Sequence, residues 1–366
     1  MNAPVSDSDP VLARLRTVHR AMGELRRGAA VLLASADGTA VLLAAETAGA
    51  EGLRSFASLA DGPAVLLLTG MRAAAVTGVP APDGPVAFRT GALLTPGTLH
   101  GVADPTAAQI LAEPLTPAPI PAAAPAAMAL VKLARVLPAV LFAPARAGPG
   151  QADTLAVSAG AVLAHADAEA CALVRVAEAA VPLAGAPDAR VIAFRSPDAG
   201  IEHLAIVIGD PASTPAPLVR VHSECFTGDL LGSLRCDCGP QLRLALERIG
   251  AAGAGVVLYL SQEGRGIGLA NKLRAYALQD RGLDTLDANR ALGWYADERN
   301  FLIAATILRD LGLPRIRMMT NNPAKIAALQ ACGIEVLGIE PLRLPPNGVN
   351  DGYLATKARR FGHDLG

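Results

Sequence analysis

The sequence has little of several features on which whole classes of protein depend. Its 366 residues include only five cysteines, and aromatic side chains make up 3%. Lys+Arg (32) almost equals Asp+Glu (33), and the formal net charge of -1 does not support a basic protein that binds nucleic acid. Five cysteines in so long a chain form no disulfide framework. Two of them, Cys171 and Cys332, sit among apolar neighbours and are expected in the core.

Long apolar runs are also missing. Although 52% of the residues are hydrophobic, charged residues, Pro or Gly interrupt every stretch of about 20 residues, so no transmembrane helix is predicted. The first 20 residues include Asp7, Asp9 and Arg14 and lack the apolar segment of a secretion signal. We therefore expect a cytoplasmic protein with reduced thiols and no membrane partner.

The length predicts two domains, and the two halves differ in composition. The first half consists mainly of Ala, Val, Leu, Gly and Pro, whereas all four Tyr, the single Trp and three of the four Lys lie after position 255. Side chains that recognise ligands by hydrogen bonding or stacking are thus concentrated in the second half. We place the boundary between residues 1–176 and 177–366 and expect the chemistry in the second domain.

Alternating strands and helices in the second half predict a layered α/β domain. The expected strands are 191–194, 203–208, 218–222, 255–260, 315–319 and 334–337, and the expected helices are 240–249, 269–279, 301–311 and 323–332. In the first half, apolar strands at 31–35 and 40–45 flank the Asp37-Gly38 turn of a hairpin, and 64–69 is a further apolar run. The prolines of 114–125 predict an extended connector before a short helix at 128–136.

Three of the cysteines form a C-x10-C-x-C pattern: Cys225, Cys236 and Cys238. Thiolates are soft ligands that favour zinc, which predicts a zinc site here. Two forms of the site are open: a closed one with His222 as fourth ligand, or three sulfurs and an open position for water, whose pKa zinc lowers towards ~7. The absence of a second cysteine pair favours the open form.

Two loops that follow predicted strands are candidates for binding phosphate groups. The run 263–268 (EGRGIG) joins a strand to a helix, where glycines admit a ligand to the backbone and the helix N-terminus favours anions. In 320–325 (TNNPAK), Asn322 is predicted to cap a helix with Pro323 at its first position. A helix start alone accounts for these two residues but not for Lys325.

These motifs together resemble the GTP cyclohydrolase II family from about residue 177 to the C-terminus. The resemblance rests on RVHSECFTGDLLGSLRCDCGPQL (220–242), SQEGRGIGLANKLRAYALQDRGLDT (261–285) and MTNNPAKI (319–326). It implies the opening of the guanine ring of GTP at the start of riboflavin synthesis, with release of formate and diphosphate. It also implies a Zn2+ ion on the three cysteines, a Mg2+ ion with the triphosphate, and a homodimer.

The resemblance assigns GTP binding to twelve positions. Arg265 is implied to pair with phosphate oxygens, Glu263 to hold magnesium, and Gln241 to bond the guanine edge. The full set is Arg220, Val221, His222, Ser223, Glu224, Gln241, Glu263, Gly264, Arg265, Thr285, Thr320 and Lys325.

Three further residues are implied to be catalytic: Tyr276, Asp297 and Arg299. The family places the Tyr276 hydroxyl by the base, makes Asp297 a proton acceptor, and makes Arg299 a nucleophile on the α-phosphate. A guanidinium with a pKa above about 12 is a poor nucleophile but a good clamp for transition-state charge, so we favour the clamp for Arg299. Without the resemblance, Tyr276 would be an ordinary core tyrosine.

The first half resembles the dihydroxybutanone phosphate synthase domain, an α/β domain often fused ahead of this enzyme, in residues 24–33 and 130–135. That synthase holds magnesium with an acidic loop and an Arg-x-Gly-His-Thr-Glu motif. Here the corresponding stretches are 34–41, which has only Asp37, and 114–127, which has no His and only Glu113 beside it. Too few carboxylates remain for the metal, so we predict a degenerate, inactive domain that serves folding, dimerisation or regulation.

Two rival functions remain. One is a related enzyme that acts on another purine nucleotide or stops at a partial reaction, and Tyr276 and Gln241 argue against it. The other is a non-catalytic zinc module that senses nucleotide or nucleic acid, which the near-zero net charge and the Asp297–Arg299 pair disfavour.

Overall fold

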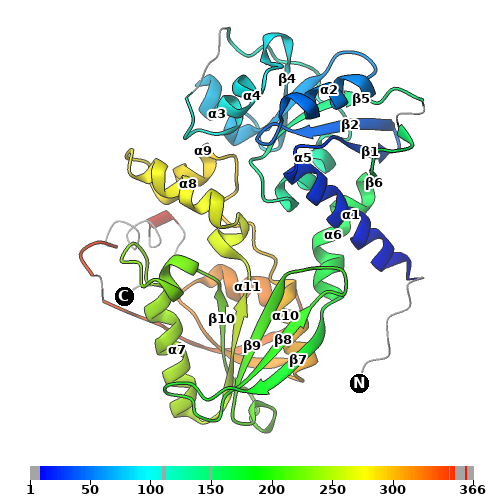
Figure 1. The fold of residues 1–366 in the computed structure, drawn as a ribbon. Helices are drawn as coiled ribbons and strands as arrows, with labels where there is room; N and C mark the ends of the chain where they lie inside the picture. Colours follow the sequence, from blue (N-terminus) through cyan, green and yellow to red (C-terminus); the bar gives the residue numbers. More distant parts are fainter. Residues whose placement is uncertain (1–8, 109–112, 149–150, 346, 351–358, 361–366) are drawn as a thin grey trace. The chain divides into compact units, whose positions relative to one another are not determined.

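The chain forms two α/β units, each built around its own sheet (Figure 1). The computed structural model describes residues 9–108, 113–148, 151–345, 347–350 and 359–360. The first unit contains the residues up to Ala166 together with Ala270–Glu298, and the second contains Asp167–Leu269 together with the residues from Arg299 onward. The predicted fold class is confirmed. Of the first 20 residues, for which no secretion signal is predicted, residues 1–8 lie outside the described residues.

The segment Ala270–Glu298 belongs to the first unit, which the sequence does not predict. It carries most of α8 (Leu269–Gln279) and all of α9 (Thr285–Ala291), and it packs with the first unit although it lies deep in the second half of the sequence. The predicted division into 1–176 and 177–366 stays a prediction, because packing and function can divide a chain differently.

The first unit has a six-stranded sheet in the order β4-β3-β5-β2-β1-β6. Its strands are β1 Val31–Ser35, β2 Gly38–Ala44, β3 Val65–Thr69, β4 Pro85–Arg89, β5 Ala139–Pro144 and β6 Ala156–Ser158. Its other helices are α1 Pro10–Arg26, α2 Ala50–Leu59, α3 Gly70–Thr77, α4 Pro96–Ala103, α5 Ala124–Leu133 and most of α6 Ala159–Cys171. The predicted hairpin is confirmed, with Val31 opposite Leu42 and Ser35 opposite Gly38.

Both faces of this sheet are buried. Leu42 and Leu67 pack with Leu25 of α1 and Leu130 of α5 in one core cluster. Their neighbours along the strands, such as Leu43, point to the opposite face because side chains alternate along a strand, and Leu43 is also fully buried. A sheet covered on both sides explains why these strands are continuously apolar.

Two predictions in the first half need correction. Helix α5 begins at Ala124 rather than 128, because Pro125 occupies the first helical turn, where its missing N–H has no intrahelical partner to lose. Cys171, predicted in the core, is exposed at the end of α6, whereas Cys332 is half-buried against the core of the second unit.

The second unit has a seven-stranded sheet in the order β13-β12-β10-β11-β9-β8-β7. Strands β13, β12, β10 and β11 are parallel, and β9, β8 and β7 continue antiparallel. The strands are β7 Val174–Ala180, β8 Arg190–Arg195, β9 Glu202–Ile208, β10 Leu218–Ser223, β11 Gly255–Leu260, β12 Arg315–Met319 and β13 Glu335–Glu340. The helices are α7 Cys238–Ala252, α10 Leu302–Asp310 and α11 Pro323–Ala331.

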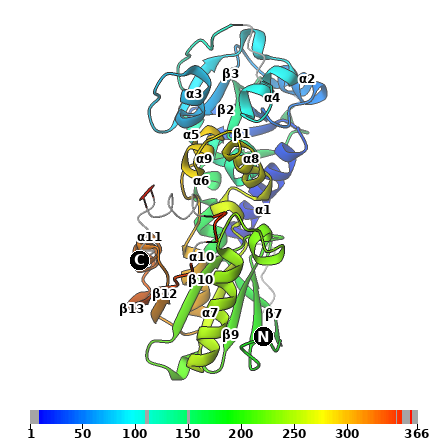
Figure 2. The same ribbon diagram turned by 90° about the vertical axis from the view of Figure 1, so that its left-hand side faces the viewer.

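Helices cover both faces of this second sheet (Figure 2). Ile249 of α7 packs with Val257 and Leu218 on one face, while Ile307 of α10 and Leu329 of α11 belong to the cluster on the other. The strands and helices predicted in this half are confirmed, and the bounds of α8, β11 and β12 coincide with those predicted. Among the described residues, none of the helices is long and apolar enough to cross a membrane.

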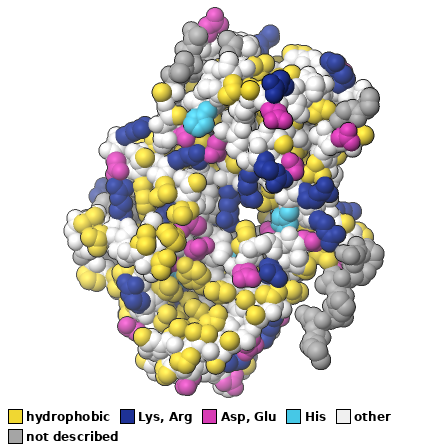
Figure 3. All heavy atoms as spheres, in the orientation of Figure 1, with side chains coloured by type: hydrophobic (Ala, Val, Ile, Leu, Met, Phe, Trp, Pro, Cys, Tyr) yellow, Lys and Arg dark blue, Asp and Glu magenta, His cyan; other side chains and the backbone are white. Residues whose placement is uncertain are grey.

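An apolar surface lies on the second unit over α7 and the loop before it (Figure 3). In that loop, Leu230, Leu231 and Leu234 are exposed by 70%, 65% and 62%. Contiguous exposed apolar side chains commonly mark an interaction surface.

Candidate metal centre and active site

Three of the predicted site segments follow three neighbouring strands. Because β11, β10 and β12 are adjacent and parallel, the chain leaves all three at the same edge of the sheet. Ligand sites of open α/β sheets lie at this carboxyl edge. The topology therefore brings together the loop after Ser223, the glycine-rich loop at Glu263 and the Thr320–Lys325 segment, which are far apart in the sequence.

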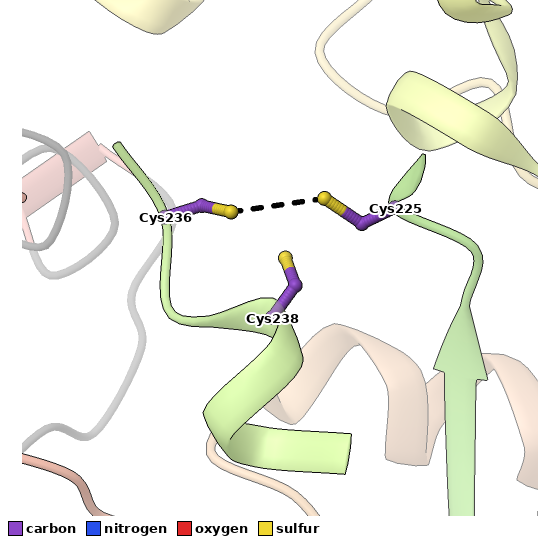
Figure 4. Close-up of side chains that lie close together, drawn as sticks. All are labelled: Cys225, Cys236 and Cys238. Atoms are coloured by element: carbon purple, nitrogen blue, oxygen red, sulfur yellow. Dashed lines mark hydrogen bonds between the residues drawn. The ribbon is translucent and has the colours of Figure 1, made fainter. Parts of the chain in front are cut away.

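The three predicted cysteine ligands form one cluster (Figure 4). Their sulfur atoms all lie within 4.8 Å of one another, and the Sγ atoms of Cys225 and Cys236 are 3.7 Å apart. Cys225 follows β10, Cys238 is the first residue of α7, and Cys225 and Cys236 are buried. One strand end and one helix start thus hold the cluster.

His222 does not complete this cluster. Its Nε2 atom lies 3.1 Å from both carboxylate oxygens of Asp229, and its ring stacks on Tyr259 with centroids 5.6 Å apart. Burial lowers the pKa of His222, although the hydrogen bond with Asp229 opposes the shift. Within the described part of the chain, no fourth Cys, His, Asp or Glu joins the three sulfurs. The geometry favours the open form over the Cys3His alternative.

Asp229 is a site residue that sequence reasoning missed. Besides contacting His222, its Oδ2 atom accepts hydrogen bonds from the Cys225 amide at 2.9 Å and from the Tyr259 hydroxyl at 3.1 Å. The carboxylate therefore fixes the backbone at Cys225. Asp229 lies in the short π-helical turn Phe226–Leu230, and nothing in the local sequence distinguishes it from an ordinary surface acid.

Gly228 and Gly239 allow the loop and α7 to approach closely. A Cβ atom at Gly228 would lie 2.7 Å from the Cys236 sulfur and 3.0 Å from the Cys225 sulfur. A Cβ atom at Gly239 would lie 2.1 Å from the Gly228 carbonyl oxygen. The space around the sulfurs therefore depends on the absence of two side chains.

The donor set fits zinc. Three sulfurs within 4.8 Å of one another match the number of protein ligands of a catalytic zinc site, which keeps a fourth position open. The hydrogen bond with Cys225, followed by burial, raises the pKa of Cys236 to about 11 and outweighs the opposing hydrogen bond with Cys238. A bound cation reverses this preference for the thiol, so metal binding is expected to release protons.

Changing Gly228 to alanine should lower the zinc content well below one ion per chain, because the added methyl group overlaps two ligand sulfurs. Overpacking of this kind costs about 1–3 kcal/mol, so we also expect a lower melting temperature. Elemental analysis and thermal melting of the purified variant measure both effects. Gly200→Ala is the matched control, since a Cβ there meets no atom within 4 Å. Full zinc occupancy in Gly228→Ala would contradict this account of the loop.

Arg220, one of the predicted binding residues, is buried. Its guanidinium donates to the Met319 carbonyl at 3.1 Å and to Gln241 Oε1 at 2.6 Å, and Gln241 in turn donates to Asp237 at 2.6 Å. Burial lowers its pKa to about 10, against the raising effect of Cys238 and Asp237. The Arg220 Nε atom has no hydrogen-bond partner among the described residues. A buried donor without a partner is costly and suits a ligand acceptor.

The Thr320–Lys325 segment, which follows β12, contacts β10 through Lys325. The Lys325 ammonium donates to the Val221 carbonyl at 2.9 Å and is buried. Thr320 Oγ1 accepts from the Asn322 amide at 3.0 Å, and Asn322 caps α11 as predicted, accepting from the Ala324 amide. Two predicted binding residues, Val221 and Lys325, are therefore in direct contact.

The glycine-rich loop is tied to the loop of the cysteine cluster. Glu263 is buried, and its two carboxylate oxygens accept from the Phe226 amide at 2.7 Å and the Gly264 amide at 2.9 Å. Arg265 has a φ of +63°, which is strained for a residue with a side chain. Such strain is typical of a loop shaped around a ligand.

Other predicted residues are divided between the two units. Arg299 belongs to the second, where its guanidinium donates to Ser223 Oγ at 3.2 Å, and the Glu224 amide donates to the Leu260 carbonyl. Tyr276, Thr285 and Asp297 belong to the first unit. There the Lys272 ammonium lies 5.7 Å from the Tyr276 ring centroid, and Thr285 begins α9.

A cluster of three cysteines that could hold a metal ion lies beside buried basic side chains at the carboxyl edge of parallel strands, an arrangement typical of α/β proteins that bind anionic ligands. A sequence model of the family described as GTP cyclohydrolase II matches residues 174–341. The chain is 46% identical to "GTP cyclohydrolase-2" of Azospirillum brasilense, over 96% of this chain and 94% of that protein. It therefore belongs to the GTP cyclohydrolase II family of enzymes, and the predicted family and enzyme class are confirmed.

Two further relatives match slightly less than half of this chain. "GTP cyclohydrolase-2" of Actinobacillus succinogenes is 52% identical over 48% of this chain and 80% of that protein. "Riboflavin biosynthesis protein RibBA" of Bacillus cytotoxicus is 56% identical over 45% of this chain and 41% of that protein. Among solved structures, a two-domain 3,4-dihydroxy-2-butanone 4-phosphate synthase from A. baumannii covers 88% of this chain and 98% of its own. Its TM-score of 0.33 and 16% identity are too low to assign a function to the first half.

Proposed function

We propose that the protein is a zinc-dependent GTP cyclohydrolase II. It would hydrolyse GTP to 2,5-diamino-6-(5-phosphoribosylamino)pyrimidin-4(3H)-one with release of formate and diphosphate, the first step of riboflavin biosynthesis. The observation that carries the proposal is the three-sulfur cluster at the carboxyl edge of the sheet in a chain of this family.

The cysteine loop is proposed to hold the metal. Cys225, Cys236 and Cys238 provide the ligands, Gly228 leaves room for them, and Asp229 orients the Cys225 backbone. Bound zinc supplies a Lewis acid that lowers the pKa of a water molecule to about 7.

The residues of the predicted binding set are proposed to bind GTP. The Arg220 Nε atom is available to an acceptor on the ligand, and Gln241 beside it suits a guanine edge. Arg265 in the strained loop and Lys325 at the start of α11 supply charge for the phosphate groups, with Val221, His222, Ser223, Glu224, Gly264, Thr285 and Thr320 as further contacts. A Mg2+ ion accompanies the triphosphate beside Glu263 in this proposal.

Tyr276, Asp297 and Arg299 are proposed as the catalytic side chains. Tyr276 orients or protonates the opened ring, Asp297 accepts a proton, and Arg299 stabilises charge on the α-phosphate. Residues 177–366 would form the catalytic domain, and residues 1–176 would be inactive as a synthase. The apolar surface over α7 supports a homodimer, and we place the protein in the cytoplasm.

Purified protein incubated with GTP and magnesium should release formate and diphosphate in equal amounts, with the pyrimidine product identified by mass spectrometry. A zinc-selective chelator, used with magnesium in excess, should stop all three, and added zinc should restore them. Diphosphate without formate would indicate the partial-reaction rival, and turnover of ATP or ITP in preference to GTP would indicate another substrate. GTP binding without any product would favour the sensor and overturn the proposal.

A further inference from the structure

Arg274 of helix α8 is bound to acidic side chains of the first half of the chain. Three nitrogen atoms of Arg274 donate to three different side chains: Nε to Asp104 Oδ2 at 2.9 Å, one terminal nitrogen to Glu46 Oε1 at 2.6 Å, and the other to Asn271 Oδ1 at 2.8 Å. Arg274 and Glu46 are largely buried, and Asp104 is buried. A planar guanidinium bound at several points fixes orientation as well as distance.

Both carboxylates are themselves fixed within the first unit. The second oxygen of Glu46 accepts from the Leu137 amide at 2.5 Å, and the second oxygen of Asp104 accepts from the Thr106 amide and hydroxyl. Burial raises the pKa of Asp104, but the hydrogen bonds from Thr106 and the charge of Arg274 outweigh it, and the net shift is downward. Asp104 is therefore kept as the charged partner of Arg274.

The rest of the segment Ala270–Glu298 is held by the first half in the same way. Asn271 Nδ2 donates to the Arg135 carbonyl at 3.1 Å, and Arg72 donates to the Ala291 carbonyl at 3.1 Å. At the end of the segment, the Lys132 ammonium lies 2.5 Å from Glu298 Oε1.

Lys132 also covers an aromatic side chain of this segment, with its ammonium 4.2 Å from the Tyr295 ring centroid. These contacts fix the segment at its start, middle and end. The segment carries Tyr276, Thr285 and Asp297, whereas Glu46, Asp104 and Lys132 lie outside the 174–341 region that the family model matches.

We infer that Glu46 and Asp104 of the first half, acting through Arg274, position Tyr276 for the reaction. Arg274 precedes Tyr276 by two residues on α8, so loss of the ion pairs changes the placement of the tyrosine without removing it. Arg274 is thus a positioning residue, and residues of the first half act on the reaction through α8, although that half is itself predicted to be inactive as a synthase. The inference rests on the proposed function and on the role of Tyr276 within it.

Full-length Arg274→Gln should lower kcat for formate release by about 10- to 100-fold, while zinc content and the KM for GTP stay within about twofold. Glu46→Gln, which keeps the volume of the side chain, should lower kcat by about tenfold, and Arg274→Lys should recover part of the loss. The matched control is Arg27→Gln, which removes an exposed arginine paired with Glu24 in the same unit. It should leave both parameters unchanged.

A double-mutant cycle with Tyr276→Phe tests whether Arg274 acts through the tyrosine. In Tyr276→Phe the further change Arg274→Gln should lower kcat by less than about twofold. If the two substitutions lowered kcat independently, so that their fold-losses multiplied, the inference would be overturned. It would also be overturned if zinc content, melting temperature and kcat fell in parallel in every variant, because that pattern indicates a merely structural role. A wild-type enzyme that releases no formate overturns the proposed function and this inference together. Active wild type with unaffected variants overturns the inference alone.

Discussion

Replacing Cys236 with serine should remove the bound zinc and lower formate release from GTP by at least about 1000-fold. Cys236 is one of only three sulfurs in the cluster, and a serine hydroxyl is a harder, far less acidic ligand than a thiol. Two remaining thiolates do not hold zinc tightly. Loss of a Lewis acid that contributes about 4 kcal/mol corresponds to this factor in rate. Elemental analysis and the formate assay measure the two losses in the same preparation.

The other cysteines provide the control for this experiment. Cys171 is exposed at the end of α6 and lies outside the cluster, so Cys171→Ser should keep one zinc per chain and full activity. Circular dichroism separates loss of the metal from loss of the fold. If Cys236→Ser kept its zinc and its activity, the sulfur would not be a ligand, and the proposed zinc site would be wrong.

The parts of the site that could be predicted from the sequence are those with a strong local signal. The three cysteines crowd into 14 positions of the sequence, and Asn322-Pro323 has the form of a helix start. The apolar strands β10 and β12 precede these two motifs, and β11 precedes the glycine-rich run 263–268. Because parallel strands share a carboxyl edge, their order is enough to bring the motifs together.

Contacts between distant residues could not be predicted in this way. Asp229 acquires its role only when the loop after β10 turns back on itself, and the same is true of Gly228 against the sulfurs. Arg274 pairs with Glu46, which lies 228 positions earlier in the sequence. A local sequence pattern does not show which distant residues will pair. The packing of α8 with the first unit could therefore not be predicted.

Some local signals in the first half were present but too weak to decide the structure. Asp9 followed by Pro10 is a helix start, and α1 begins there with Asp9 accepting from the Val11 amide. The prolines of 114–125 predict an extended segment, yet Pro125 lies in the first turn of α5, where a proline is tolerated. Because this half is rich in Ala, Leu and Val, its helices and its buried strands both appear as apolar runs that hydrophobic periodicity does not tell apart.

Changing Arg299 to alanine should lower diphosphate release by about 100- to 1000-fold, the usual effect of removing a donor that stabilises transition-state charge. The Arg299 guanidinium donates to Ser223 Oγ at 3.2 Å and lies 5.1 Å from the Phe301 ring centroid, so its position is fixed from two sides. Diphosphate measured during initial turnover gives the effect. Arg195→Ala, which removes an exposed arginine paired with Glu202, is the control and should change nothing.

The nucleophile and clamp mechanisms for Arg299 differ in whether a covalent bond forms between the protein and the nucleotide. If Arg299 is the nucleophile, a guanidine nitrogen bonds to the α-phosphorus, the bond to the bridging oxygen breaks, diphosphate leaves, and water later releases the nucleotide. If Arg299 is a clamp, water attacks the phosphorus directly and no bond to the protein forms. A guanidinium is protonated at neutral pH and has no free electron pair to offer, which favours the clamp.

Labelling with [α-32P]GTP, followed by alkaline denaturation during the first turnover, separates the two mechanisms. We expect no label on the protein, and we expect Arg299→Lys to be about tenfold more active than Arg299→Ala, because it retains a positive charge without the planar fork. Free guanidinium ion should restore part of the activity of Arg299→Ala and yield the ordinary diphosphate and pyrimidine products. Label that approaches one per chain in wild type and is absent from Arg299→Ala would show a covalent step and reject the clamp.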